Sequence, residues 1–204
     1  MPNTGVLLVE GKDDEHVFYA LLEFHHIPEV FTIKDKEGIS NLLSTLEVEL
    51  LASDLTRLGI VIDADLDLGA RWQQTTDILR NAGYADIPAV PNRDGTIIEQ
   101  PGHPTVGLWI MPENTLPGML ENFVSFLVPA NDSLWDRVHR CIEGIPKADR
   151  RFPADHLIKA QIHTWLAWQE DPGAPLGLAI TKRYLEANSP HAQQLMNWIL
   201  RLFS

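Results

Sequence analysis

The stretch "GVLLVEGKDDEHVFYALL", residues 5–22, joins a short apolar run to a charged turn and then to a second apolar pattern. Its apolar residues are consecutive before Glu10 and recur at helical spacing after Asp14. This order predicts a strand, a tight turn at Gly11 and a helix that is capped by Asp13 or Asp14. Glu10, at the tip of the strand, is either a ligand for a cation or an ordinary residue of the turn.

The same strand and helix pattern occurs twice more in the first half of the chain. Strand-like runs at residues 30–34 and 57–65 are each followed by a helix-like segment, at residues 39–53 and 70–83. Alternation of this kind is typical of a largely parallel sheet with helices on its faces. We therefore predict an α/β fold.

The pattern changes in residues 87–112, which contain five prolines and the short β-rich runs "TIIE" and "VGLWIM". These runs predict a strand or hairpin at the edge of the sheet and one further strand. The rest of the chain shows the apolar spacing of helices. We predict an α/β domain over residues 1–129 and a helical extension packed on it over residues 130–204. Four tryptophans are expected in the core of the helical part: Trp135, Trp165, Trp168 and Trp198.

The formal net charge of −12 restricts the functions that the chain can have. Non-specific binding of nucleic acid depends on Lys and Arg that neutralise phosphates, so an acidic protein should bind polyanions weakly. Segregation of charge, or a bound metal ion, would remove this objection. The residues that could form a local basic patch are Lys147, Arg150, Arg151 and Lys159.

Cysteine content and hydropathy indicate the cellular compartment of the protein. Cys141 is the single cysteine, which excludes an internal disulfide framework and a cysteine-based zinc cluster, and we expect it to pack within a helix. The apolar run near the N-terminus is too short for a signal peptide or a membrane span. We expect a cytoplasmic protein with no membrane partner.

The second charged strand tip is "GIVIDADLDLG", residues 59–69. Its β-branched residues are typical of a strand that is buried on both faces. If the backbone stayed extended beyond the strand, Asp63, Asp65 and Asp67 would project to one side. Such like charges repel one another, and a hard cation such as Mg²⁺ would relieve the repulsion. The alternative is that these acids only cap the following helix.

Glu10 and Asp63 end two strands of the same predicted sheet. In open parallel sheets, ligands bind outside the carboxyl ends of the strands, near a switch in strand order. We therefore expect the two acids to face one crevice. Other motifs fail on spacing, since the sequence has neither the glycine spacing of a P-loop, nor the glycine and final glutamate of an EF-hand loop, nor a GxSxG segment.

The motifs "LLVEGKDD" and "IVIDADLD", in this order, resemble those of the Toprim domain. That domain is shared by topoisomerases, bacterial primases, the overcoming-lysogenization-defect (OLD) nucleases and a small ribonuclease that matures ribosomal RNA. Its Glu-Gly turn matches Glu10 and Gly11, and its Asp-x-Asp pair matches Asp63 and Asp65. The whole chain is also similar to a small stand-alone Toprim group of unknown function, through "PENTLPGMLENF" and "IKAQIHTWLAW".

The resemblance implies a nuclease that uses Mg²⁺ or Mn²⁺ to hydrolyse phosphodiester bonds of DNA or RNA. In OLD-like nucleases a further acid and a lysine complete the site, and their counterparts by analogy are Glu121 and Lys159. Many Toprim proteins place a glycine three residues after the second Asp, whereas Gly69 lies four residues after Asp65 and two after Asp67, so which Asp pair binds metal stays open. The expected catalytic residues are Glu10, Asp63, Asp65 and Lys159, and the expected metal ligands are Glu10, Asp63, Asp65, Asp67 and Glu121.

Two other functions stay open. The first is a Toprim module that has no activity of its own, or that is activated by a partner such as an ATPase, in a defence or repair assembly; the net charge of −12 favours it. The second is a phosphatase that uses Asp63 as the nucleophile of an Asp-x-Asp motif. A topoisomerase and a primase are excluded, because the chain lacks room for the additional parts that they need.

Overall fold

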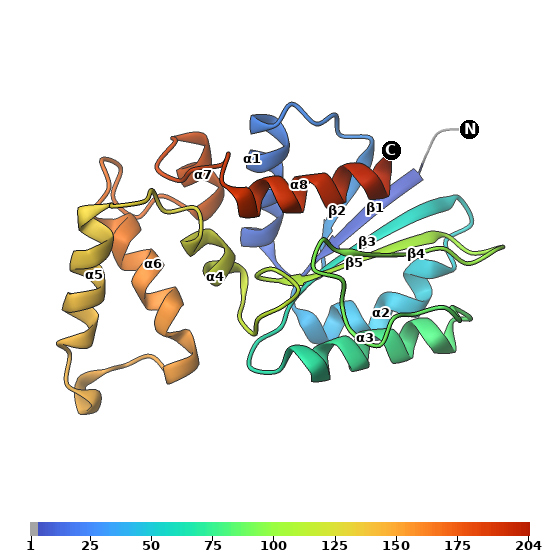
Figure 1. Cartoon of the computed structure of the whole chain (residues 1–204), viewed down its shortest axis with the longest axis horizontal. Coiled ribbons are helices and arrows are strands. Elements are labelled where there is room, and N and C mark those ends of the chain that lie inside the picture. Colours follow the sequence, from blue (N-terminus) through green and yellow to red (C-terminus); the bar gives the residue numbers. More distant parts are fainter. Residues whose placement is uncertain (1–3) are drawn as a thin grey trace.

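Residues 4–204 are described by the computed structural model, and they form one five-stranded sheet with helices on both faces (Figure 1). The strands are β1 (Thr4–Val9), β2 (Phe31–Asp35), β3 (Leu55–Asp63), β4 (Thr96–Ile98) and β5 (Thr105–Met111). The helices are α1 (Lys12–Phe24), α2 (Ile39–Leu50), α3 (Leu68–Asn81), α4 (Leu120–Ser125), α5 (Ser133–Glu143), α6 (Leu157–Ala167), α7 (Leu176–Thr181) and α8 (Pro190–Phe203). Two short 3₁₀ helices, η1 (Lys147–Asp149) and η2 (Ala154–His156), lie between α5 and α6.

The strands follow the order β2-β1-β3-β5-β4 across the sheet. β2, β1, β3 and β5 run parallel to their neighbours, and the short β4 pairs antiparallel with β5 at one edge. The predicted α/β class with a mostly parallel sheet is therefore confirmed. The expected edge strand in "TIIE" and the further strand in "VGLWIM" correspond to β4 and β5.

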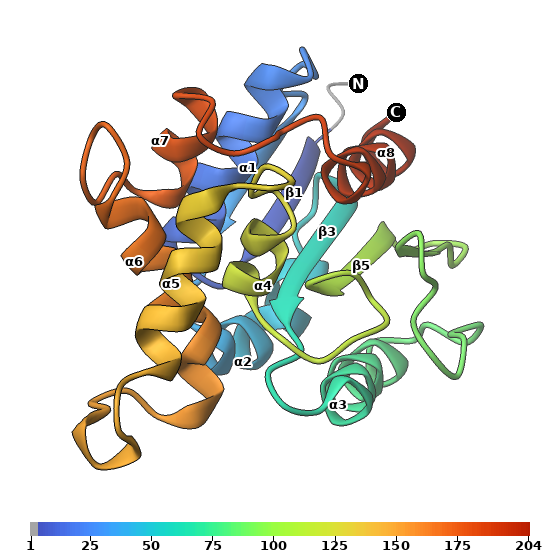
Figure 2. The same cartoon turned by 60° about the vertical axis from the view of Figure 1, so that its left-hand side comes forward.

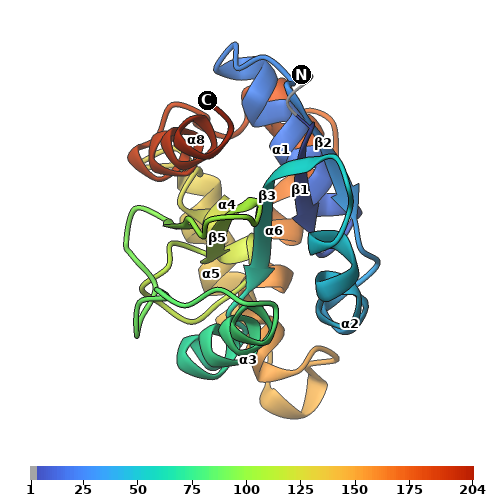
Figure 3. The same ribbon diagram turned by 90° about the vertical axis from the view of Figure 1, so that its right-hand side faces the viewer.

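The sheet is buried on both faces, because successive residues of its strands point to opposite sides. Along β1, Leu8 belongs to the hydrophobic cluster formed with α2 and α3, whereas Leu7 and Val9 belong to the cluster formed with α1 and α8. Figures 1 and 3 show α1 and α8 above the strands and α2 and α3 below them. The carboxyl ends of β1 and β3 lie at one edge of the sheet, beside the beginnings of α1 and α4.

The C-terminal helix α8 lies close against the sheet because β3 and β5 carry glycines beneath it. A Cβ atom at Gly59 would lie 3.2 Å from Leu202 Cδ2, and one at Gly107 would clash with Leu202. Trp198 of α8 packs beside Trp109 of β5, with ring centroids 5.7 Å apart. The end of the chain therefore completes the core around the first strands.

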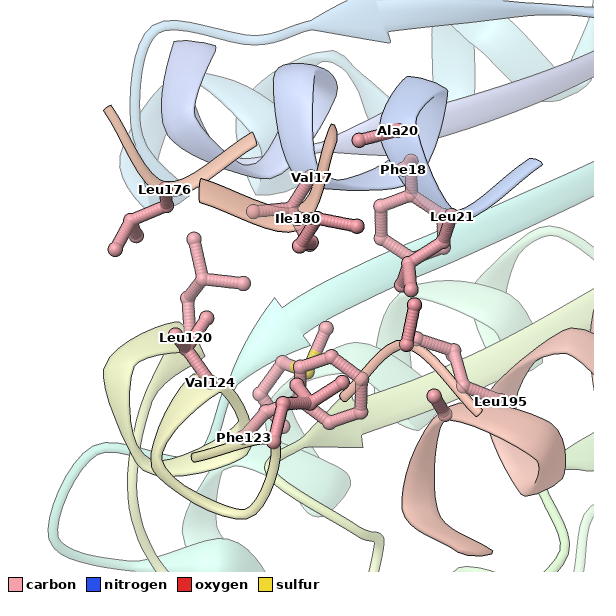
Figure 4. Packing of buried hydrophobic residues seen from close by; sticks show 14 of the residues in the cluster. Val17, Phe18, Ala20, Leu21, Leu120, Phe123, Val124, Leu176, Ile180 and Leu195 are labelled. Atoms are coloured by element: carbon pink, nitrogen blue, oxygen red, sulfur yellow. The ribbon is translucent and has the colours of Figure 1, made fainter. Parts of the chain in front are cut away.

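Helices from both halves of the sequence share one hydrophobic cluster, which Figure 4 shows from close by. Side chains of α1, α4, α7 and α8 meet there, among them Phe18, Phe123, Ile180 and Leu195. The helices beyond residue 129 thus contribute to the same hydrophobic cluster, in which α8 packs on the sheet and α7 packs on α1. The domain boundary expected at that residue stays a prediction.

Two expectations about the helical part are wrong. Trp165 and Trp198 are buried, but Trp168 is 39% exposed, so the tryptophans do not all lie in the core. Cys141 is exposed on α5 and does not pack within the protein. Among residues 4–204, no helix has both the length and the apolar character that crossing a membrane requires.

Candidate metal centre

Glu10 and Asp63 meet at the carboxyl edge of the sheet. Glu10 directly follows β1, Asp63 is the last residue of β3, and these two strands are neighbours. The backbone N–H of Asp63 donates a hydrogen bond of 2.7 Å to Glu10 Oε1. β2 and β3 lie on opposite sides of β1, so the strand order switches here, which is where open parallel sheets bind ligands. The structure thus brings the two strand-tip acids together at the switch point.

The carboxylate of Asp63 also holds the beginning of α4. Its Oδ1 accepts a hydrogen bond of 2.9 Å from the backbone N–H of Leu120, the first residue of that helix. The next residue, Glu121, is only 3% exposed, and its Oε1 lies 2.7 Å from Lys159 Nζ of α6. Glu121 and Lys159, which the resemblance suggested only by analogy, therefore lie at the same edge of the sheet as Asp63.

Asp14 is a further acid at this edge, and it was not among the expected site residues. The N-cap residue of α1 is Gly11, so neither Asp13 nor Asp14 occupies that position, but Asp14 does cap the helix from its third position. Asp14 reaches back from the first turn, and its Oδ2 accepts a hydrogen bond of 3.1 Å from the Gly11 N–H. The sequence carried a signal for its burial, since the apolar residues Val17, Phe18 and Leu21 follow Asp14 on the same face of the helix.

A cavity of about 520 Å³ opens between these elements. Its lining includes seven carboxylates and two lysines: Glu10, Asp13, Asp14, Asp35, Glu37, Asp63, Glu121, Lys12 and Lys159. Lys12 is exposed and forms ion pairs with Glu15 and Asp35, so Lys159 is the lysine that faces the buried acids. Negative charge therefore exceeds positive charge in the cavity.

Burial and mutual repulsion raise the pKa values of three acids in this cavity, Glu10, Asp14 and Asp63. Burial is the largest cause for Asp63, followed by the charges of Asp14 and Glu10, and the pKa of Asp63 lies well above its usual value. Burial, followed by the charge of Glu10, raises the pKa of Asp14 to about 7. Burial also raises the pKa of Glu10, although the hydrogen bond from the Asp63 N–H opposes the change. A cation in the cavity would stabilise the charged forms of all these groups.

The pKa of Lys159 is raised as well. Burial by itself lowers the pKa of this ammonium group, but the hydrogen bond and the charge of Glu121 outweigh burial. The ion pair therefore keeps Lys159 positively charged beside the acids.

Asp65 turns away from this cavity. β3 ends at Asp63, and Asp65 adopts a left-handed backbone with a φ of 52° while its N–H donates a hydrogen bond of 2.8 Å to the carbonyl of Gly118. The exposed side chain of Asp65 forms an ion pair of 2.6 Å with Arg71. The backbone is thus not extended beyond β3, and the expectation that the three aspartates project to one side is wrong.

Asp67 acts as a helix cap. It is the N-cap residue of α3, and its Oδ1 accepts a hydrogen bond of 2.9 Å from the Ala70 N–H. Asp65 and Asp67 both line a second cavity, of about 810 Å³, next to the first. The charge of Asp65 still contributes to the raised pKa values of Glu10 and Asp63, whereas Asp67 does not appear among their causes. Of the Asp-x-Asp pairs, the one formed by Asp63 and Asp65 is nearer to the buried acids.

The residues of the first cavity suit a hard cation in donor chemistry and in charge. Carboxylate oxygens are the ligands that Mg²⁺ and Mn²⁺ prefer, and the hydrogen bonds to Glu10, Asp14 and Asp63 each orient one oxygen of a group that has two. Within residues 4–204, however, no group of three acidic, histidine or cysteine side chains is already close enough to chelate an ion. Glu121 is paired with Lys159, and Asp65 with Arg71. Binding of a metal would therefore require some of these side chains to move.

Comparison with known proteins identifies the family. Residues 4–204 match the model of a family described as "Protein of unknown function (DUF3226)". The chain belongs to the DUF3226 family. No curated protein matches the sequence.

Among solved structures, those of the C-terminal region of the OLD protein from Xanthomonas campestris pv. campestris are similar to this member of the DUF3226 family. The structure phased with mercury has a TM-score of 0.49 and 15% sequence identity, over 96% of this chain and 93% of the other. The structure phased with platinum has a TM-score of 0.39 and 20% identity, over 96% and 83% of the two chains. The structure phased with iodine has a TM-score of 0.36 and 22% identity, over 95% and 84%.

Proposed function

We propose that this protein is a metal-dependent nuclease of the Toprim type, which hydrolyses phosphodiester bonds of nucleic acid. The observation that carries the proposal is the hydrogen bond between Glu10 and the N–H of Asp63 at the strand switch point, with buried carboxylates gathered around it. The motifs that hold Glu10 and Asp63 are the two motifs that resemble the Toprim domain. The order of the strands, with these acids at their carboxyl ends, is consistent with that assignment.

In this proposal Glu10 and Asp63 are the principal ligands of Mg²⁺ or Mn²⁺, and Asp14 and Glu121 complete the negative cavity. The bound ion would supply Lewis-acid chemistry and offset the charge of a phosphodiester. Lys159 is positioned to contact a phosphate oxygen, because its ammonium group is charged and half-exposed at the edge of the cavity. Burial and the charge of Glu10 raise the pKa of Asp14 to about 7 in the metal-free protein, and a bound cation would favour its charged form.

A second candidate function is a Toprim module that becomes active only with a partner. It is favoured by the ion pairs of Glu121 with Lys159 and of Asp65 with Arg71, which keep two acids engaged with cations of the chain itself. A partner protein that displaced either ion pair would release a carboxylate for the metal. An ATPase is the class of partner that the resemblance suggests.

The test is cleavage of single- and double-stranded DNA and RNA in Mg²⁺ or Mn²⁺, with Asp63→Asn and Glu10→Gln compared with the wild type. We expect each substitution to reduce cleavage by roughly 100-fold or more, because each removes a carboxylate ligand of the metal ion that the proposed chemistry needs. Asp86→Asn is the matched control, since Asp86 is exposed and lies outside the cavity, and it should cleave like the wild type. Equal cleavage by Asp63→Asn and wild type would contradict the proposal.

Metal binding is measured separately by thermal unfolding with and without the ion. A ligand that binds only the folded state raises the unfolding temperature, so Mg²⁺ or Mn²⁺ should stabilise the wild type and Asp86→Asn but not Asp63→Asn. Stabilisation without cleavage would favour the partner-activated module. Absence of both would exclude the proposed metal centre.

A further inference from the structure

Positive charge is concentrated in one segment of this acidic protein, residues 137–159. The segment contains six Lys and Arg against three Asp and Glu, a charge of +3, whereas the remaining residues contain ten against twenty-five, a charge of −15. It comprises most of α5, the connection through η1 and η2, and the beginning of α6. Charge is therefore segregated, which is the condition under which an acidic protein can still bind a polyanion.

Five of the six cations of this segment form no ion pair with a carboxylate, and the sixth, Lys159, is paired with Glu121. All four lysines outside the segment, and the arginines of α3, form ion pairs: Lys12, Lys34, Lys36, Arg71, Arg80 and Lys182. Within residues 4–204, the five basic residues that precede α6 in the segment form none: Arg137, Arg140, Lys147, Arg150 and Arg151. We call these five residues the hairpin cations, and all except the half-buried Arg150 are exposed.

The hairpin cations are gathered at one end of the α5–α6 pair. Arg137 and Arg140 are three residues apart on α5, so they lie on one face of that helix. Arg150 folds over the end of α5, where its guanidinium donates hydrogen bonds to the carbonyls of Ile145 and Glu143. Lys147 and Arg151 flank Arg150 along the connection. The charges therefore lie along the second half of α5 and the connection that follows it.

Hydrogen bonds hold α5 and α6 together. Asp132 caps α5, and its Oδ1 also accepts a hydrogen bond of 3.3 Å from Trp165 Nε1 of α6. Gln161 of α6 lies 2.9 Å from His139 Nδ1 of α5. The two helices are thus joined by polar contacts at two levels as well as by packing, and they hold the hairpin cations in place.

The same segment borders the candidate metal centre. Figures 1 and 2 show α5 and α6 beyond the carboxyl ends of the strands. His156 of η2 and Gln161 of α6 line the 810 Å³ cavity together with Asp65 and Arg71. Further along α6, Lys159 reaches Glu121 in the acidic cavity. The chain that follows the hairpin cations therefore lines the larger cavity at Asp155 to Gln161 and reaches the acidic cavity through Lys159.

We infer that the hairpin cations are the surface on which the phosphate backbone of nucleic acid docks before it reaches the acidic cavity. This inference rests on the proposed function, and it adds where the substrate is held. Contacts of Lys and Arg with phosphates do not distinguish one base sequence from another, so docking should be independent of sequence. Docking should also weaken as the salt concentration increases, because these contacts are electrostatic. The repulsion of the acidic remainder restricts binding to this surface.

The experiment compares Lys147→Ala/Arg151→Ala with the wild type by fluorescence anisotropy of labelled single-stranded and duplex oligonucleotides. EDTA is present, so that binding is measured without cleavage, and the salt concentration is varied. We expect the double variant to bind roughly 10-fold or more weakly at low salt, with a salt dependence that is smaller by about two charges. The matched control is Arg93→Ala/Lys182→Ala, which removes the same charge from exposed positions elsewhere and should bind like the wild type.

Each outcome decides the inference. Failure of the wild type to bind in EDTA, or equal losses in the two double variants, would overturn it. Poly-glutamate binding that is as tight as oligonucleotide binding and equally dependent on Lys147 and Arg151 would also overturn it, in favour of an acidic protein partner. Binding that depends on the hairpin cations in a protein that cuts nothing would support the inference and contradict the nuclease activity, so the two failures can be distinguished.

Discussion

Asp63, Asp65 and Asp67 are two residues apart in the sequence, but each has different surroundings in the folded protein. Asp63 is buried and holds the N–H of Leu120, Asp65 is exposed and paired with Arg71, and Asp67 caps α3. Their chemistry follows from these surroundings, because burial raises the pKa of a carboxyl whereas a nearby guanidinium stabilises its charge. Residue type and spacing identified the stretch, but burial separates Asp63 from the other two.

At the residue scale, Asp14 should make stability depend on pH. Its pKa rises from 3.8 to about 7 on folding, so between these values the folded protein binds a proton that the unfolded chain has lost. The stability that Asp14 contributes is fully present at pH values below its pKa in the unfolded chain. It is lost as the pH rises through its pKa in the folded protein. Asn has no charge to bury, so Asp14→Asn does not lose this stability at high pH. Above the pKa of Asp14 in the folded protein, the free energy of unfolding of Asp14→Asn should exceed that of the wild type by on the order of a few kcal/mol.

Urea unfolding at acid and alkaline pH, without metal, measures this effect. Asp86→Asn removes an exposed carboxylate and should keep the pH dependence of the wild type. Parallel stability curves for Asp14→Asn and the wild type would show that Asp14 does not carry a raised pKa.

At the scale of elements, glycines let two helices lie unusually close to their neighbours. α8 depends on the glycines of β3 and β5, and α7 depends on Gly177, where a Cβ atom would lie 2.5 Å from the carbonyl oxygen of His16 in α1. A backbone carbonyl cannot rotate aside as the end of a side chain can. α7 can therefore stay against α1 only while residue 177 has no side chain.

We expect Gly177→Ala to lower the free energy of unfolding by about 1–3 kcal/mol, because the helices must separate to accept the methyl group. Chemical denaturation measures this change. The control is Gly69→Ala near the start of α3, where the nearest atom to a new Cβ would be Asp67 Oδ1 at 3.4 Å. There alanine should leave stability unchanged or raise it by up to about 1 kcal/mol through helix propensity; an equal loss in both variants would contradict the argument.

At the scale of the whole molecule, residues of α8 help to form the hydrophobic core around β1 and α1. Trp198, Leu202 and Phe203 belong to the same hydrophobic cluster as the residues of β1 and α1. Lys159 of the helical part also reaches Glu121 in the acidic cavity. The helices beyond residue 129 therefore contribute to stability and to the candidate site together.

A chain shortened to residues 1–129 should not fold cooperatively, because removal of α8 exposes one face of the sheet to water. Thermal unfolding followed by near-ultraviolet circular dichroism tests this, with the full chain as the control. A single cooperative transition in the shortened chain would instead support an independent domain that ends at residue 129.

The sequence alone determined the βα alternation, the mostly parallel sheet, and the strand-tip acids Glu10 and Asp63. These depend on the periodicity of apolar residues and on the order of elements, which are local properties that a sequence displays.

Only the tertiary structure decided which acids share a cavity. Asp14, Glu121 and Lys159 come together from α1, α4 and α6, and this depends on contacts between segments far apart in the chain. Asp65 and Asp67 are separated from Asp63 by the left-handed turn that begins at residue 65, which apolar spacing does not reveal. Burial and the direction of each side chain are set by packing, and these two quantities determine the charge that the site can hold.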